Sequence, residues 1–558
     1  MKPSTSPQCR CIPQDPCWPS TADWDRLNDT LSGRLIATVP LAHVCHDPQY
    51  NQTACDALKK GWPYIQTHAS SPSSFVSPLA QNQSCDPFTS ALSKCQLGNE
   101  PIYAVNVSSP DHIAETLKFA HLNNIRVIVK NTGHDLLGKS SGSGSLSIWV
   151  HSLKEISITK TYSGANAFLN YSGPAARLGA GVMVYEALEA SSKEGLRVLG
   201  GTCPTVASAG GYTTGGGHSI LSSKYGLSAD NVLEWEVVTA NGEHIIATPS
   251  SNADLYWALS GGGAGVFAVV VSMTVKAFPE GVMSAASLSF NISSSPSEDI
   301  FWSAVEDFHQ LLPQVLEDDV SAGYVIVGGS FSLRPLTAPD KTKEYVTNLV
   351  SPYISKLEQL EIPYTLDVTS FPSYYDMYVT FFGPLPYGAD SYPQSEVQTS
   401  RLIPQSTLTN QTSELIEAHR QIAALENGSL WIVGNAFQIP HVPSAAPSNS
   451  VLPAWRDTVV HQMIVGLWNW TSTWDENLGK ERAMQDAVLP LLSAFSSATY
   501  LNEGDPNQKD WKEAFYGANF ERLEKIKSVW DPADVLYAQT GIGSEKFRSD
   551  DAGRLCYK

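Results

Sequence analysis

The chain has 558 residues, 55 of them acidic and 36 basic, with a formal net charge of −19. This acidity disfavours nucleic acid or an anionic membrane surface as a partner, because both require a basic surface. Apolar residues make up 42% of the chain, which supports globular cores and excludes a disordered chain. The length exceeds what one core supports, so we expect two or three domains. The longest good apolar run, Val266 to Val275, suits a buried strand and is too short to span a membrane.

Cysteines and glycosylation sequons together predict a secreted protein. Nine cysteines allow four disulfides with one thiol left over, and seven of the nine lie in the first hundred residues. The start Met-Lys-Pro-Ser has no apolar signal region, so we expect a signal peptide that has been removed. Nine Asn-x-Ser/Thr sequons favour the same route, at Asn28, Asn51, Asn82, Asn106, Asn170, Asn291, Asn410, Asn427 and Asn469.

Residues 1–98 are rich in Pro, Ser, Cys and Asn and predict a disulfide-linked arm over a larger domain. Equal spacings suggest the local pairs Cys45/Cys55 and Cys85/Cys95. Cys9, Cys11 and Cys17 then share Cys556, so we expect one bridge between the two ends. A zinc site with His43 and His46 is the alternative, but these spacings fit no common zinc pattern and secreted thiols usually oxidise.

From Pro101 the sequence alternates between strand and helix patterns. Residues 103–107 read as a strand, and Ser109-Pro110-Asp111 predicts the start of a helix that ends at Asn124. The β-branched strand 126–130 then runs directly into Asn131-Thr132-Gly133-His134-Asp135. A similar unit follows, with a helix over 182–194, a strand over 197–199, and then Gly200-Gly201-Thr202-Cys203. His134 and Cys203 therefore each follow the C-terminal end of a strand, where ligands bind in α/β sheets.

The segment 130–141 is a glycine-rich turn that could hold a pyrophosphate through its backbone N–H groups. An ordinary tight loop is the alternative. The nicotinamide fingerprint G-x-G-x-x-G is missing from this turn. Gly138 to Gly142 matches G-x-S-x-G, but a strand pattern follows it where a hydrolase requires a helix. Cys203 is the cysteine left unpaired by the predicted disulfides. The glycines around it suggest that a planar or phosphorylated ligand passes close by, whereas the alternative is a buried thiol that acts only as a small apolar side chain.

After Pro279 the pattern changes to longer amphipathic stretches and alternating strands, including 323–327 and 430–434, and predicts a second domain. Residues 510–530 predict one long helix, with Asp510 and Glu513 as a capping box and Asp531-Pro532 as its end.

These motifs resemble the flavin-binding module of the vanillyl-alcohol-oxidase/PCMH superfamily, in its berberine-bridge-enzyme-like branch. The resemblance rests on segments 131–140, 201–206, 210–217 and 516–523, on Tyr500-Leu501-Asn502-Glu503, and on Asp531-Pro532. Within that branch, the sequence most resembles fungal secreted proteins described as isoamyl alcohol oxidase-like, from its Cys-rich start to Cys556. The resemblance implies an α+β fold with a PCMH-type FAD-binding domain of two subdomains (99–278, joined by 504–558). A substrate domain (279–503) with an antiparallel sheet covered by helices completes it.

The resemblance also implies FAD attached twice, through His134 to the flavin 8α-methyl and through Cys203 to flavin C6. Val206 matches the position beside flavin C4a that admits oxygen when its side chain is small. The expected cofactor-binding residues are Asn131, Thr132, Gly133, His134, Asp135, Gly138, Ser140, Cys203, Val206, Gly210 and Gly211.

The implied function is a secreted, monomeric oxidase that takes a hydride from an alcohol-type carbon and passes electrons to O₂, with a small molecule as substrate. The family's catalytic glutamate aligns near His461-Gln462, and Glu503 replaces a family tyrosine. Glu503 is therefore the first candidate base, with His461 and Tyr500 as competitors; a solvated acid in a turn is the alternative for Glu503. Three other functions stay open: an oligosaccharide oxidase, an oxidative cyclase of secondary metabolism, and a non-catalytic flavin-binding protein.

Overall fold

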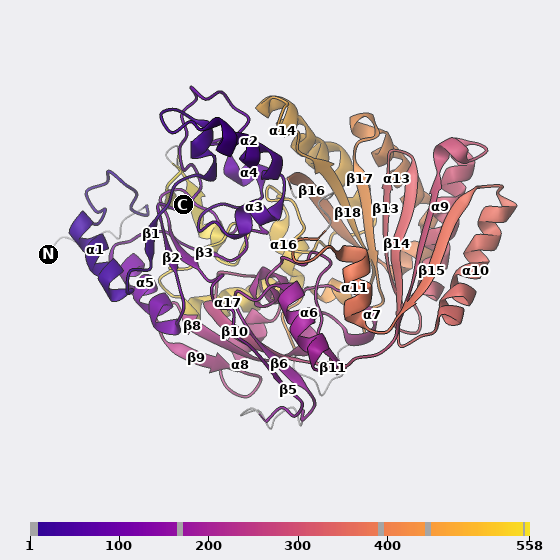
Figure 1. Cartoon of the computed structure of the whole chain (residues 1–558), viewed down its shortest axis with the longest axis horizontal. Coiled ribbons are helices and arrows are strands. Elements are labelled where there is room, and N and C mark those ends of the chain that lie inside the picture. Colours follow the sequence, from indigo (N-terminus) through magenta and orange to yellow (C-terminus); the bar gives the residue numbers. More distant parts are fainter. Residues whose placement is uncertain (1–8, 164–170, 389–394, 441–447, 551–552) are drawn as a thin grey trace.

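The computed structural model describes residues 9–163, 171–388, 395–440, 448–550 and 553–558. Figure 1 shows two sheet-bearing portions side by side, with the C-terminal segment, in yellow, lying against the first of them. The first portion holds the strands up to Lys276, and the second holds the strands from Met283 to Leu467. No helix in the described ranges is long and apolar enough to cross a membrane.

The first sheet has four strands in the order β1-β2-β4-β3, of which β2, β4 and β3 are parallel. Helix α5 connects β2 to β3; Ser109 caps it by accepting from the His112 N–H, and Pro110 is its first residue. The predicted strands and helix are confirmed, although the helix ends at Leu122. The bounds are Leu35–Ala37 (β1), Tyr103–Asn106 (β2), Pro110–Leu122 (α5), Val127–Lys130 (β3) and Leu146–Trp149 (β4).

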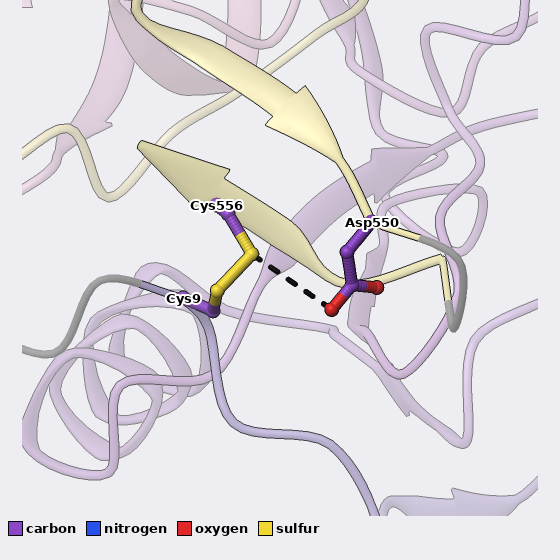
Figure 2. Close-up of side chains that lie close together, drawn as sticks. All are labelled: Cys9, Asp550 and Cys556. Carbon is purple, nitrogen blue, oxygen red and sulfur yellow. Dashed lines mark hydrogen bonds between the residues drawn. A yellow bond between two sulfur atoms is a disulfide. The ribbon is translucent and has the colours of Figure 1, made fainter. Parts of the chain in front are cut away.

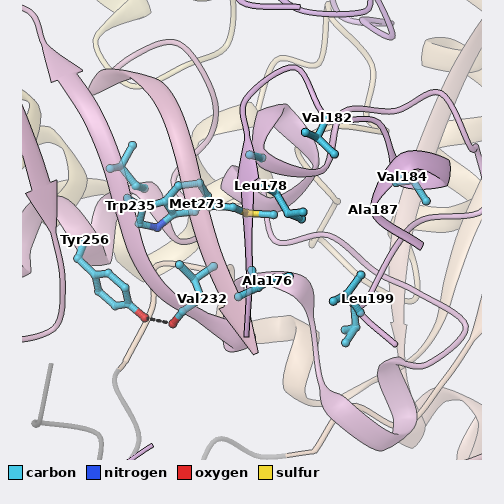
Figure 3. Close-up of a cluster of buried hydrophobic side chains, with 14 of the residues drawn as sticks. Ala176, Leu178, Val182, Val184, Ala187, Leu199, Val232, Trp235, Tyr256 and Met273 are labelled. Carbon is cyan, nitrogen blue, oxygen red and sulfur yellow. Dashed lines mark hydrogen bonds between the residues drawn. The ribbon is translucent and has the colours of Figure 1, made fainter. Parts of the chain in front are cut away.

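The second sheet is antiparallel, with the order β5-β6-β10-β8-β9. Figure 3 shows its core, where Trp235, Met273 and Leu178 gather and the Tyr256 hydroxyl donates to the Val232 carbonyl at 2.8 Å. The predicted buried strand is confirmed as β10. The bounds are Ile156–Thr159 (β5), Ala175–Gly179 (β6), Val232–Thr239 (β8), His244–Ala247 (β9), Ala253–Leu259 (α8) and Ala268–Lys276 (β10).

The second repeat of the strand–helix pattern is confirmed with shorter bounds. The helix predicted over 182–194 is α6, Val184–Lys193. The strand predicted over 197–199 is β7, Leu196–Arg197, and it pairs with β11, Phe278–Pro279. Residues 198–203 therefore form the connection that carries Cys203 away from the strand.

The third sheet has seven antiparallel strands in the order β15-β12-β14-β13-β17-β18-β16. Helices α9, α10 and α13 pack on one face and close a core with its apolar side chains (Figure 1). The two predicted strands are confirmed as β13 and β17. The bounds are Met283–Asn291 (β12), Glu298–Val315 (α9), Ser321–Val327 (β13), Ser330–Pro339 (β14), Lys343–Gln359 (α10), Tyr364–Phe371 (β15), Glu396–Pro404 (β16), Thr412–Ala424 (α13), Trp431–Ala436 (β17) and Thr458–Leu467 (β18).

The edge strand β16 is covered, because all of its residues but Pro404 are buried. The opposite edge strand, β15, carries half-buried and exposed side chains, with Val368 as its one buried residue. Further helices complete the fold at Ser222–Tyr225 (α7), Tyr374–Phe382 (α11), Gln405–Asn410 (α12), Trp474–Ala483 (α14) and Leu489–Ser493 (α15).

The prediction of one long helix over 510–530 is wrong. Helix α16, Trp511–Tyr516, ends at Gly517, which has a φ of +50° in the left-handed region, and α17, Phe520–Trp530, begins after a short 3₁₀ turn. The Asp510 side chain makes no capping hydrogen bond. Beyond α17, Leu536 forms a parallel bridge with Val127, so the C-terminal segment returns to β3.

All eight cysteines other than Cys203 are in disulfides: Cys9–Cys556, Cys11–Cys17, Cys45–Cys55 and Cys85–Cys95. The predicted local pairs and the bridge between the two ends are confirmed. Figure 2 shows the Cys9–Cys556 bridge, with the Asp550 carboxylate 4.0 Å from Cys556 Sγ. The zinc alternative fails because Cys9, Cys11, Cys17 and Cys45 are all in disulfides, while His46 Nε2 lies 3.0 Å from the Asp86 carbonyl.

The N-terminal arm is more regular than its composition predicts. It contains the short helices Thr21–Thr30 (α1), Gln52–Gly61 (α2), Ile65–Ala69 (α3) and Pro78–Gln81 (α4). Its segment 71–76 holds the loop after β3, because the Val76 N–H donates to the Gly133 carbonyl at 3.1 Å and Lys130 Nζ donates to the Ser71 carbonyl at 2.8 Å.

Most predicted sequons lie on the surface. Asn51, Asn82, Asn291, Asn410, Asn427 and Asn469 are exposed, whereas Asn28 and Asn106 are half-buried. Asn170 lies outside the described residues.

Candidate active site

The loop after β3, residues 131–141, is shaped around the carboxylate of Asp135. This carboxylate accepts from the backbone N–H groups of Leu137, Lys139 and Ser140 and from the Ser140 hydroxyl, at 2.6–3.2 Å. Asp135 and Ser140 therefore fix the shape of the loop through each other. Gly133 has a φ of +86°, and a Cβ there would lie 2.9 Å from the Ser74 carbonyl oxygen, so this position requires glycine.

The same loop has free donors that suit a bound anion. Within the described ranges, no protein acceptor bonds to the backbone N–H groups of Thr132, Gly133, His134, Leu136 or Gly138. The Asn131 side chain donates to the Ala180 carbonyl at 2.5 Å, while its buried Oδ1 has no partner in that part of the chain. Clustered backbone donors are typical of pyrophosphate sites, so these residues fit FAD.

The structure brings the two predicted attachment residues into one site. Nε2 of His134 lies 2.6 Å from Oγ1 of Thr205, and Thr205 follows Cys203 by two residues. Burial lowers the pKa of His134 to about 3, so its imidazole is neutral. Burial and then the Glu503 carboxylate raise the pKa of the Cys203 thiol to about 12. A thiol this far from ionisation resists disulfide exchange, which agrees with its being the unpaired cysteine.

The segment after Cys203 is fixed against the start of α6. The Val184 N–H donates to the Val206 carbonyl at 2.8 Å, and the Tyr185 N–H donates to the Pro204 carbonyl at 3.0 Å. Val206 itself is half-buried against the first core. Gly210 faces the loop after β3, because a Cβ there would lie 3.5 Å from Asn131 Nδ2. The predicted cofactor residues of the two segments thus come together.

Two histidines surround the predicted base Glu503. Oε2 of Glu503 lies 3.3 Å from His218 Nε2 and 3.3 Å from His461 Nδ1. His461 comes from β18 of the third sheet, whereas His218 follows the run Gly215–Gly217 of the first portion. Gly217 has a φ of +76°, and a Cβ there would lie 2.9 Å from Ser228 Cβ, so glycine sets the turn that directs His218 here.

The electrostatics of this cluster make Glu503 a carboxylate. Its burial alone would raise its pKa, but His218 and then His461 hold the pKa below the ordinary value. Burial lowers the pKa of His461 to about 3. Burial, reinforced by Glu503, raises the pKa of Glu396 on β16 to about 8. The site therefore combines one ionised carboxylate with a neutral imidazole and a neutral carboxylic acid.

Tyr500 lies in the same site but is a weaker candidate base. Burial and then Glu503 raise its pKa well above the ordinary value. Its hydroxyl accepts a hydrogen bond from Asn502 Nδ2 at 2.8 Å, and Asn502 also donates to the Gly211 carbonyl at 2.7 Å. The Tyr500 ring packs against His218 and Trp455, with ring centroids 5.5 and 5.3 Å away. Tyr500 thus forms a wall of the site.

The two residues aligned with the family's glutamate point to opposite faces of β18. His461 joins Glu503, whereas Gln462 accepts from the Tyr324 hydroxyl at 2.9 Å inside the core of the third sheet. Neighbouring strand residues alternate between faces, so only His461 can reach the site.

Sequence reasoning missed His218, Thr205 and Glu396. His218 directly follows the glycine run 215–217, and Thr205 lies within the motif 201–206 that contains Cys203. Both residues are therefore next to motifs that the sequence already indicates as parts of the flavin site. No comparable signal marks Glu396, because its role depends on the burial of the edge strand β16.

Two family models match the chain. The model described as "FAD binding domain" matches residues 101–248, and that described as "Berberine and berberine like" matches residues 499–543. The first match contains both His134 and Cys203, and the second contains Glu503.

Similar proteins cover nearly the whole chain. "VAO-type flavoprotein oxidase VAO615" of Thermothelomyces thermophilus is 43% identical over 99% of this chain and 96% of its own. "Bifunctional decalin synthase calF" of Penicillium decumbens is 42% identical over 100% of this chain and 96% of its own. The crystal structure of VAO-type flavoprotein MtVAO615 from Myceliophthora thermophila C1 has a TM-score of 0.93, with 42% identity over 99% of this chain and 100% of that one.

A more distant structure shares the fold alone. It is glucooligosaccharide oxidase from Acremonium strictum, described as containing a 6-S-cysteinyl, 8α-N1-histidyl FAD. Its TM-score is 0.65, with 18% identity over 79% of this chain and 91% of that one. Together these structures confirm the mixed α+β fold of the VAO/PCMH type.

Proposed function

The chain belongs to the VAO-type family of FAD-linked oxidoreductases with a berberine-bridge-like segment, and on that premise we propose a secreted oxidase of alcohol-type carbons. The observation that carries this proposal is the Glu503 carboxylate held between His218 and His461. FAD, when bound, takes a hydride at N5 and passes two electrons to O₂, which gives H₂O₂.

Glu503 is the proposed general base. An ionised carboxylate at Oε2 can take the proton of a substrate hydroxyl as the hydride leaves the adjacent carbon. His218 contacts this carboxylate and is the main group that holds its pKa below the ordinary value, so Glu503 stays ionised at neutral pH. Burial and then the Glu503 carboxylate raise the pKa of Glu396 to about 8, so Glu396 stays largely uncharged at neutral pH.

We propose that FAD is attached through both His134 and Cys203. Support comes from the contact of His134 with Thr205, which lies two residues after Cys203, from the free backbone donors of the loop after β3, and from the double linkage named for the Acremonium strictum enzyme. Protein precipitated with acid should stay yellow, and His134→Ala or Cys203→Ala alone should retain flavin. A colourless wild-type pellet would exclude both linkages.

Secretion is supported by four disulfides and by the exposure of six sequon asparagines.

We also propose the division into an arm (1–98), an FAD domain (99–278 with 504–558) and a substrate domain (279–503). It agrees with the separation of the sheets, and it places the active site where His461 of the second portion meets His218 of the first.

An oxidative cyclase of secondary metabolism is the second candidate function. It is favoured by the 42% identity with a bifunctional decalin synthase over essentially the whole chain. Such an enzyme would use the same flavin site and the same base on a larger carbon skeleton.

Release of H₂O₂ across a panel of short alcohols, oligosaccharides and phenolics tests the proposal. At least one alcohol-type substrate should release H₂O₂, and Glu503→Gln should lower kcat/KM by about 10²-fold or more while the flavin stays attached. Glu503 would not be the base if the Gln variant kept full activity. Flavin-loaded protein that oxidised none of the panel would favour the cyclase or the non-catalytic alternative.

A further inference from the structure

The hydroxyl of Thr205 is the only partner that His134 has in the part of the chain that the structure describes. Oγ1 of Thr205 lies 2.6 Å from His134 Nε2, and Nδ1 of the ring makes no hydrogen bond there. Thr205 is 1% exposed, so water does not compete for this contact. One ring nitrogen is thus occupied by protein and the other is free.

We propose that Thr205 is a positioning residue that presents Nδ1 of His134 to the flavin 8α-carbon and keeps Nε2 from reacting. The inference rests on the proposed attachment of FAD to His134. A hydroxyl suits this role because it can accept a hydrogen bond at one stage and donate one at another.

The attachment step requires the Thr205 hydroxyl to change from hydrogen-bond acceptor to hydrogen-bond donor. Before reaction, Nδ1 must have a free lone pair, so the proton sits on Nε2 and Nε2–H donates to Thr205 Oγ1. Once Nδ1 is bonded to carbon, a neutral imidazole has its lone pair on Nε2, and the Thr205 hydroxyl must donate to it. Valine has nearly the same shape but can do neither.

The step balances with O₂ as the oxidant. The Nδ1–C8α bond forms, while one C8α–H bond and the imidazole N–H bond break. Both hydrogens and the electron pair pass to the isoalloxazine ring and leave it as H₂O₂ when O₂ reoxidises the flavin. Burial of His134, which holds its pKa near 3, keeps the imidazole neutral before the bond forms, and loss of the Nε2 proton makes it neutral again afterwards.

The backbone around Thr205 gives the hydroxyl a fixed position. The carbonyls of Pro204 and Val206, on either side of Thr205, accept from Tyr185 and Val184 at 3.0 and 2.8 Å. A β-branched side chain also has few χ1 choices. Thr205 therefore orients His134 from the segment that begins at Cys203, which couples the two attachment points.

The test uses the full chain in a Cys203→Ala background, where His134 is the only remaining attachment residue. Acid-precipitated protein and peptide mass spectrometry report how much flavin is bonded to His134, without an activity measurement. Thr205→Val should lower the bonded fraction, or its rate of formation, at least about tenfold, whereas Thr205→Ser should retain it. Thr202→Val is the matched control, since Thr202 makes no hydrogen bond to His134 in the described residues, and it should retain the linkage.

The outcomes separate the two proposals. Full linkage at the wild-type rate in Thr205→Val would overturn the role of Thr205 and leave the attachment to His134 standing. Absence of flavin on His134 in the parent chain would overturn both. Thr205→Ala is the second variant if valine prevents folding, and it should lose the linkage in the same way.

Discussion

Nζ of Lys139 donates a hydrogen bond to the backbone carbonyl of Leu501 at 2.8 Å. Lys139 belongs to the loop after β3, and Leu501 lies two residues before Glu503. The loop that would hold the cofactor and the turn that carries the proposed base are therefore joined directly, although they are 362 positions apart.

Replacing Lys139 by methionine should change how stability depends on pH. Burial lowers the pKa of Lys139 to about 8, whereas an unfolded lysine titrates near 10.4. Between these values the unfolded chain holds a proton that the folded chain lacks, so this group adds stability as the pH rises from 8 to 10. The Tm of the wild type should therefore increase relative to Lys139→Met over that range. The exposed Lys118→Met is the control and should track the wild type.

His218→Leu should move the acid limb of the pH–activity profile to higher pH. His218 is the main group that lowers the pKa of Glu503, and the base works only when ionised, so activity falls as the pH drops through that pKa. Without His218, the limb should shift upward by about one pH unit. A profile of kcat/KM measures this shift. An unchanged limb, with exposed His121→Leu as the control, would mean that another group governs it.

Val206→Leu should slow the reaction of reduced flavin with O₂. The prediction rests on the expected position of Val206 beside flavin C4a. Val206 is half-buried and its carbonyl is held by the Val184 N–H, so a leucine there would have little freedom to turn away. We expect reoxidation of photoreduced enzyme to slow roughly tenfold or more, with attachment of flavin and reduction by substrate largely intact. Equal rates in stopped-flow measurements would show that oxygen reaches the flavin by another route.

Removing the Cys9–Cys556 bridge should destabilise the protein more than removing Cys11–Cys17. The sequence separations are 547 and 6, for which the chain-entropy model gives about 6 and about 2 kcal/mol. Chemical denaturation of the Cys9→Ser/Cys556→Ser and Cys11→Ser/Cys17→Ser variants compares them. Equal losses would indicate that native packing dominates over loop closure.

N-linked glycans should occur at the exposed sequons and not at Asn106. The Oδ1 atom of Asn106 is buried, whereas Asn51, Asn291 and Asn410 are exposed. Mass spectrometry after deglycosylation of protein from a eukaryotic host should find modified peptides at the exposed positions. Unmodified peptides at every one of them would count against secretion through the glycosylating route.

Local signals explain how much of this fold could be predicted. Ser109 and Pro110 mark the start of α5 without tertiary information, and the β-branched run before Asn131 marks β3. The prediction of one long helix over 510–530 is wrong because the backbone turns at Gly517, between the signals that mark its start and its end. His134 and Cys203 could be found because each lies in a glycine-rich turn after a strand. His218 also follows a glycine run, but its role depends on Glu503, which is 285 positions away, so the local motif alone does not indicate that role.

The third sheet has two edges, and only one of them is open to another chain. Edge strand β16 is buried along nearly its whole length, so its free backbone groups are out of reach. The other edge strand, β15, carries Asp367 on an exposed position. Two copies that met along β15 would bring like charges toward each other, which opposes pairing of edge strands. Burial therefore protects the β16 edge of this sheet, and the Asp367 charge disfavours pairing at the β15 edge. Both features oppose aggregation by strand addition.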